Sequence, residues 1–272
     1  MSEYEQILGF MRAVEDRSAE RTVASRFGTA VVHERLARVH DLNFLRADAT
    51  EKASAEELAA ETERIYGPLG LRHRKVTVLD RAESERLKPA FSALGWRTTA
   101  YVVMASRQRP QRAADLSVVR EAEAVELRHL WAEGIRRAQE DEEVVQQLVA
   151  WKDVIAKAVP TRYYVAEAEG KIVAYCEFYS EGGIGQFEAV MTREPYRNRG
   201  LASALVLKSL EQSRADGNAL TFLIALENDW PRKLYERLGF EPVGLFDDFV
   251  KRRYPPSSNR SRRGDVPRGS RG

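Results

Sequence analysis

A short basic segment with a central glycine is the part of this sequence best suited to bind a charged ligand. It follows a strand-like run, residues 187–192, and reads Arg197-Asn198-Arg199-Gly200-Leu201-Ala202. An apolar helical pattern begins directly after it, so the segment predicts a loop that opens a helix. The first turn of a helix offers free backbone N–H groups and partial positive charge. Gly200 lets the backbone approach a ligand closely, and Arg197 and Arg199 add cationic donors. We therefore interpret the loop as a pyrophosphate cradle, although ordinary strand-to-helix turns also match so short a pattern.

The elements around this loop are predicted clearly in the second half of the chain. The predicted order is strand 116–120, helices 122–137 and 141–158, strands 162–168, 172–178 and 184–192, a helix from the loop to about 215, strand 219–226, helix 231–238 and strand 242–250. Strands and helices mixed in this way predict an α/β fold.

A second motif follows the loop, and its Asn228 lies 26 residues after Ala202. It begins with Glu227-Asn228, continues through Tyr235 and ends with Gly239-Phe240. With the basic loop before it, it resembles the GNAT superfamily of acyl-CoA-dependent N-acetyltransferases, over residues 116–250. The resemblance implies an α/β (α+β) fold with a mixed, mostly antiparallel sheet flanked by helices, and acetyl-CoA (acyl-CoA) as co-substrate without a metal.

The resemblance also assigns roles to residues of this chain. It implies that backbone groups of residues 190–192 hold the pantetheine arm, that the loop and the following serine hold the pyrophosphate, and that Asn228 hydrogen-bonds the arm. The cofactor-binding residues so implied are Val190, Met191, Thr192, Arg197, Asn198, Arg199, Gly200, Leu201, Ala202, Ser203 and Asn228.

Catalysis of this kind needs a proton acceptor for the amine and a proton donor for the leaving thiolate. Tyr235 resembles the family's general acid. Glu188 is our candidate general base, because positions 188 and 190 share a face of a regular strand; Glu177 is the alternate. A packed tyrosine, a solvated or structurally paired Glu188 and a helix-capping Asn228 remain the plainer interpretations.

The first half resembles a degenerate copy of part of the same fold. Its predicted elements are a helix 3–21, strands 30–35 and 41–47, a helix opened by a capping box at Ser54-x-x-Glu57, strand 73–80, helix 82–94 and strand 98–104. A shift of 144 residues superposes many of these elements on the second half. Glutamates then stand at the phosphate loop and Phe91 stands opposite Tyr235, so we expect a single cofactor site.

These patterns divide the chain into an N-terminal domain, 1–104, a linker, 105–115, an acetyltransferase domain, 116–250, and a disordered basic tail, 251–272. The tail carries eight Lys and Arg against one acidic residue, so the rest of the chain is mildly acidic despite a net charge of +2. We expect no nucleic-acid or membrane partner. The acidic first residues and the absence of a long apolar run predict a cytoplasmic protein. We expect it to be a monomer or a homodimer. The single cysteine, Cys176, is expected to be buried and inert, and the four histidines show no metal-binding spacing.

The sequence thus favours an N-acetyltransferase that transfers an acetyl group from acetyl-CoA to a primary amine of a small molecule or peptide by direct attack. The alternative is a non-catalytic acyl-CoA-binding sensor.

Overall fold

The computed structural model describes residues 1–111, 113–138 and 141–252. The helices are α1 (Glu3–Ser18), α2 (Ala55–Tyr66), α3 (Arg81–Ala93), α4 (Ala124–Arg136), α5 (Glu142–Ala158), α6 (Leu201–Ala215) and α7 (Pro231–Arg237). The strands are β1 (Arg21–Ser25), β2 (Gly28–Val32), β3 (Phe44–Ala47), β4 (His73–Val78), β5 (Arg97–Ser106), β6 (Val119–Ala122), β7 (Thr161–Ala168), β8 (Lys171–Glu181), β9 (Ile184–Thr192), β10 (Leu220–Leu226) and β11 (Phe240–Arg252). Most of the predicted tail, residues 253–272, lies outside the described residues; Lys251 and Arg252 belong to β11 and not to a tail.

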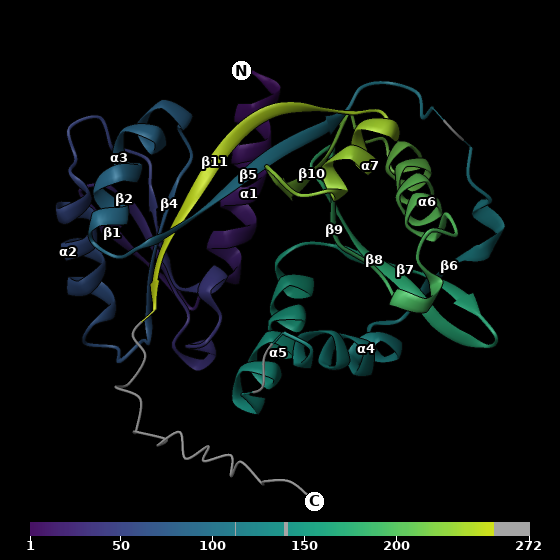
Figure 1. Ribbon diagram of the computed structural model, residues 1–272, viewed down its shortest axis with the longest axis horizontal. Helices are drawn as coiled ribbons and strands as arrows, with labels where there is room; N and C mark the ends of the chain where they lie inside the picture. The colour runs from purple at the N-terminus through teal and green to yellow at the C-terminus, as the bar shows by residue number, and fades with distance from the viewer. Residues whose placement is uncertain (112, 139–140, 253–272) are drawn as a thin grey trace, which may run out of the picture.

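All these strands form one sheet, in the order β1-β2-β3-β4-β11-β5-β10-β9-β8-β7-β6. Only β3–β4 and β9–β10 run parallel among the pairs of described strands, so the predicted mixed, mostly antiparallel sheet is confirmed. The buried clusters show that α2, α3, α6 and α7 pack on one face of the sheet, and α1, α4 and α5 on the other. Figure 1 shows the two halves of the chain side by side, with β5 and β11 running between them.

The last strand of each half completes the sheet of the other half. β5 ends the first half but pairs with β10, and β11 ends the second half but pairs with β4. The two exchanged strands also pair with each other, from Ser106 opposite Phe240 to Arg97 opposite Val250. The halves are therefore joined by continuous backbone hydrogen bonding as well as by the connecting segment.

The predicted repeat is visible in the order of elements. α2 follows a strand of the first parallel pair as α6 follows a strand of the second, and α3 and β5 follow β4 as α7 and β11 follow β10. The first half thus has the fold of a partial copy of the second.

Some element predictions were wrong in detail. β1 was missed because its alternating exposed residues carry little apolar pattern. The predicted strand 30–35 ends at Val32, where a 3-10 turn (Glu34–Leu36) begins, and the predicted strand 116–120 begins as a 3-10 turn (Leu116–Val118).

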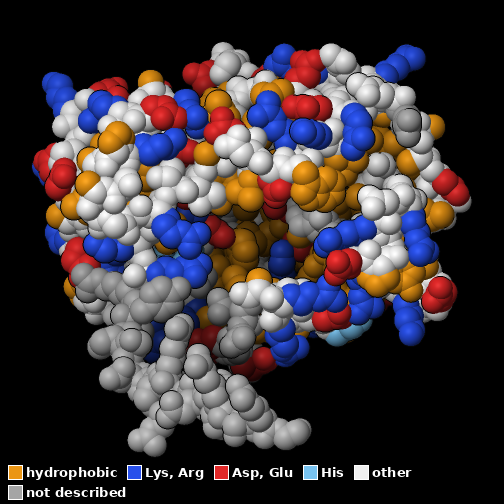
Figure 2. All heavy atoms as spheres, viewed as in Figure 1, with side chains coloured by type: hydrophobic (Ala, Val, Ile, Leu, Met, Phe, Trp, Pro, Cys, Tyr) orange, Lys and Arg blue, Asp and Glu red, His pale blue; other side chains and the backbone are white. Residues whose placement is uncertain are grey.

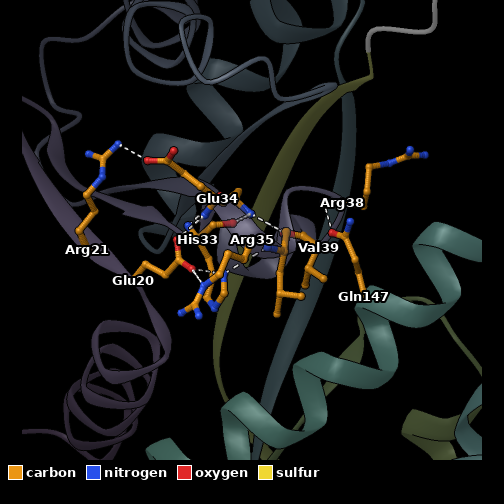
Figure 3. Close-up of polar contacts among 10 residues, drawn as sticks. Glu20, Arg21, His33, Glu34, Arg35, Arg38, Val39 and Gln147 are labelled. Atoms are coloured by element: carbon orange, nitrogen blue, oxygen red, sulfur yellow. Dashed lines mark hydrogen bonds and ion pairs between the residues drawn. The ribbon is translucent and has the colours of Figure 1, made fainter.

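The turns after β2 hold α5 against the first half (Figure 3). His33 Nδ1 accepts a hydrogen bond from Leu36 N, and Arg35 pairs with Glu20. The backbone N–H of Arg38 donates to Gln147 Oε1 of α5 at 2.8 Å. Apolar residues of the turns pack below this bond on the same helix, namely Leu36, Val39 and Leu42 against Leu148, Trp151 and Val154. α5 is thereby fixed over the sheet between the two halves.

Candidate active site

The parallel strands β9 and β10 separate at the centre of the second half. Their hydrogen-bonded register runs from Ile184 opposite Leu220 to Phe187 opposite Leu223 and then stops. β9 continues to Thr192 beside β8, and β10 continues beside β5. The edge of β9 that faces β10 therefore has no strand partner over residues 188–192. Extended amide groups of a ligand could pair with such an edge.

A β-bulge lies at the point of separation. Ala189 has a φ of 51°, and the register with β8 shifts between the Glu177–Glu188 and Tyr175–Met191 pairs. The expectation that positions 188 and 190 share a face was therefore wrong, because the bulge inserts one residue into the alternation. Val190 packs in the cluster under α6, whereas Glu188 lines a cavity on the opposite face.

Glu188 lies in an environment that disfavours its charged form. Burial is the main cause that raises the pKa of its carboxyl to about 7; Glu177 adds to the rise, whereas Lys152 and the hydrogen bond from Gln186 oppose it. The Gln186 Nε2 donates to Glu188 Oε1 at 2.6 Å. A carboxylate with a pKa near neutrality is suited to accept a proton at physiological pH.

Glu177, the alternate base, already has a cation and a hydroxyl beside it. It is 1% exposed, its Oε1 lies 2.8 Å from Lys152 Nζ, and its Oε2 accepts a hydrogen bond from the Tyr179 hydroxyl at 2.9 Å. Sequence reasoning missed Lys152, because nothing in the pattern of α5 distinguishes it from a solvated lysine.

Tyr235 lies on the other face of the sheet. It packs against the cluster under α6 and makes an edge contact with Phe240, with ring centroids 6.3 Å apart. Burial chiefly, with Glu188 and Cys176 contributing, raises the pKa of its phenol to about 12. The side chain therefore keeps its proton at neutral pH and lies close enough to Glu188 for the two groups to interact electrostatically.

The basic loop leaves its positive groups free. Gly200 is the N-cap of α6 with a φ of 80°, and no side chain caps this helix. Arg197 and Arg199 donate only to the backbone carbonyls of Thr192 and Pro195, and within the described ranges neither has an ion-pair partner. Free amides at a helix N-terminus beside two unpaired guanidinium groups fit a diphosphate.

A cavity of about 740 Å³ opens from this loop. It runs between the start of α6, the side of α7 and residues 111 and 113–118, and Arg199, Gly200 and Ser203 line it. Asn228 is exposed in the turn between β10 and α7, on the β10 side of the separated strands, and Thr192 Oγ1 on the β9 side is buried without a hydrogen-bond partner. Of the predicted cofactor residues, Arg199, Gly200, Leu201 and Ser203 line this one cavity.

The matching region of the first half has neither feature. β3 and β4 stay paired to their last residues, Ala47 opposite Val78, so no opening separates them. Ser54 and Glu57 satisfy each other's N–H groups in a capping box, which occupies the N-terminus of α2. Phe91 replaces the tyrosine and stacks on Phe249.

Other predicted features are simple to place. Cys176 is buried and free, and burial raises the pKa of its thiol to about 12. Over the described ranges, the structure has no group of three or more His, Cys, Asp or Glu side chains able to hold a metal ion. None of the described helices is long and apolar enough to cross a membrane.

Comparison with known proteins assigns the second half to a family. Residues 124–240 match the model of the acetyltransferase (GNAT) family. No match was found among curated proteins.

Solved structures extend the similarity to the whole chain. A GCN5-related N-acetyltransferase from Kribbella flavida aligns with a TM-score of 0.64 at 18% identity, over 92% of this chain and 96% of that one. A functionally unknown conserved protein from Staphylococcus epidermidis ATCC 12228 aligns with a TM-score of 0.65 at 11% identity, over 85% and 93%. A tandem GNAT protein from the clavulanic acid biosynthesis pathway aligns with a TM-score of 0.50 at 16% identity, over 77% and 75%. Such identities establish a likeness of fold. Residues 124–240 therefore form an acetyltransferase domain of the GNAT family, preceded by a partial copy of the same fold.

Proposed function

We propose that this protein is an N-acetyltransferase that transfers the acetyl group of acetyl-CoA directly to a primary amine. The observation that carries the proposal is the opening between β9 and β10, with Glu188 on one face of the sheet and Tyr235 on the other. At neutral pH the two groups are in the protonation states that the reaction needs, since a carboxyl with a pKa of about 7 is partly ionised and can accept a proton, and the phenol still carries its proton.

The residues around the opening fit acyl-CoA in a consistent order. The start of α6 with Arg197 and Arg199 suits the diphosphate, and the unpaired edge of β9 suits the amides of the pantetheine arm. The hydroxyl of Thr192 is buried without a hydrogen-bond partner, so it is free to bond a polar group of the ligand.

Glu188 accepts a proton from the ammonium form of the acceptor. The amine nitrogen then forms a bond to the thioester carbonyl carbon as the carbon–sulfur bond breaks, and Tyr235 supplies a proton to the departing sulfur. The nitrogen gives up its second proton as the amide forms, and this proton returns through solvent to the Tyr235 phenolate. An alkylammonium has a pKa near 10.4, so at pH 7 its deprotonation requires roughly 4–5 kcal/mol, and a base close to the nitrogen lowers this requirement.

The experiment that tests this proposal is release of free thiol from acetyl-CoA against a panel of amines: lysine peptides, N-terminal peptides, polyamines, aminoglycosides, amino acids and arylalkylamines. Amine-dependent release with formation of the N-acetyl product supports the proposal. Tight binding of acetyl-CoA without release for any amine would replace it with the acyl-CoA sensor.

A further inference from the structure

A cavity between the two halves of the chain lies on the Glu188 face of the sheet. Its volume is about 290 Å³. The residues that line it are Met11, Val14, Glu15, Ser18, Asp41, Leu42, Phe44, Lys75, Thr77, Tyr101, Trp151, Lys152, Ile155, Tyr179, Gln186, Glu188, Ile224, Phe246 and Asp248. Both halves therefore contribute to it, and α1 and α5 enclose it. Figure 2 shows a hollow with hydrophobic side chains at the centre of the molecule.

We infer that this cavity receives the acceptor, and that the acceptor is a small primary amine with an aromatic or otherwise apolar body and no carboxylate. The inference rests on the proposed function and names the substrate class for the same site. It is carried by the size of the cavity, its apolar walls, its charges and a buried hydroxyl without a partner.

The size and the walls limit the body of the acceptor. Ligand cavities range over about 300–1,000 Å³, and this one lies just below that range, so only a small acceptor fits. Between the polar groups, the walls are aromatic and aliphatic, with Trp151 and Tyr101 among the largest side chains. Such walls stabilise an apolar body. The lining also includes the carboxylates of Glu15, Asp41 and Asp248, but these already pair with cations of the protein, Glu15 with Arg46 and both aspartates with Lys75. They are therefore not free to bind the further ammonium groups of a polyamine.

The charges of the cavity favour a cation over an anion. Lys75 lies 2.5 Å from Asp41 and 2.8 Å from Asp248, and Lys152 lies 2.8 Å from Glu177, so both lysines are neutralised by carboxylates. Glu188, in contrast, has no ion-pair partner among the described residues. An ammonium group can therefore pair with Glu188, whereas a carboxylate on the acceptor would find no unpaired cation.

Ser18 supplies an independent sign of a ligand. This last residue of α1 is 2% exposed, lines the cavity, and its Oγ has no hydrogen-bond partner. Buried hydroxyl groups are nearly always hydrogen-bonded, so an unsatisfied one at a cavity wall points to a polar atom supplied by a ligand. A single hydroxyl on an otherwise apolar body would satisfy it.

The test measures binding and turnover separately on the full chain. Calorimetry in the presence of CoA compares phenethylamine, tyramine, phenylalanine and spermidine. We expect phenethylamine and tyramine to bind at least tenfold more tightly than phenylalanine and spermidine. Equal or reversed affinities would overturn the inference. Acetylation of a different amine class would overturn it while leaving the proposed function intact, whereas selective binding without any acetylation would refute only the proposed function.

Two variants locate the binding in this cavity. Trp151→Leu should weaken phenethylamine binding about tenfold, because it removes an aromatic wall. Leu148→Ala is the matched control, since Leu148 packs on the same turns from the same helix but does not line the cavity. Ser18→Ala, a small change in a buried site, should reduce the preference for tyramine over phenethylamine. If both Trp151→Leu and Ser18→Ala left all affinities unchanged, the acceptor would bind elsewhere.

Discussion

Glu177 and Glu188 lie directly opposite each other on the neighbouring strands β8 and β9. Like charges in such a pair destabilise each other, and the two carboxylates differ in the partners that offset this repulsion. Lys152 pairs with Glu177 at 2.8 Å, while Glu188 receives only the neutral amide of Gln186. One carboxylate thus has a cation beside it, and the other is left with a pKa near neutrality.

Replacement of Glu188 by glutamine should remove most of the activity. We expect kcat/KM to fall by about 10²- to 10³-fold, because the proton acceptor is lost while the shape of the side chain is kept. When the rate of thiol release is plotted against pH from 5.5 to 9, the unchanged protein should show a limb that rises near pH 7. The variant should lack this limb. Affinity for acetyl-CoA is the control and should not change; a variant that retained full activity at pH 7 would remove Glu188 from the role of base.

The neighbours of Glu188 should move this limb in opposite directions. Glu177→Gln removes a negative charge that raises the pKa of Glu188, so the limb shifts to lower pH. Lys152→Met removes a positive charge that lowers the pKa, so the limb shifts to higher pH. Shifts of roughly 0.5–1 pH unit are expected. Asp41 acts in the same sense as Glu177 and provides a third variant, Asp41→Asn. Shifts of the same sign for Glu177→Gln and Lys152→Met would contradict this account of the site.

Tyr235→Phe should lower turnover about 10²-fold and leave the affinity for CoA unchanged, because only a proton donor is lost. Tyr196→Phe, in the loop before α6, is the control variant. Rates are to be compared in single turnovers, so that slow product release does not mask the chemical step. An unchanged rate would assign Tyr235 to packing against Phe240 alone.

Charge reversal at the loop should weaken CoA binding. Arg197→Glu and Arg199→Glu are each expected to raise the Kd for CoA about tenfold or more, with smaller effects at high salt, because two unpaired cations face the proposed diphosphate position. Arg214→Glu, at the far end of α6, is the matched control. If all three variants bound CoA alike, the diphosphate would not lie at this loop.

The exchanged strands predict that the two halves do not fold alone. A fragment with residues 116–252 lacks β5 and exposes the free edges of β10 and β11, so we expect it to aggregate or remain unfolded. Cleavage of the full chain at a protease site inserted between Arg109 and Pro110 should leave the pieces together in gel filtration. The predicted domain boundaries, 1–104 and 116–250, would be supported as independent units if the fragment instead unfolded cooperatively by itself.

The sequence by itself determined the family of the second half and the position of its loop. Arg197, Gly200, Asn228 and Tyr235 are local signals, because a phosphate-binding turn or a helix motif needs particular residues at fixed spacing. The capping box at Ser54 and Glu57 was predicted for the same reason, and the structure has it.

Only the tertiary structure decided how these residues meet. The bulge at Ala189 moves Glu188 to the face opposite Val190, and a strict alternation cannot reveal an inserted residue. The pairing of Lys152 with Glu177, the exchange of β5 and β11, and the cavity between the halves all join residues far apart in the chain. Such contacts depend on which strands become neighbours, and that is set by the packing of the whole sheet rather than by any local pattern.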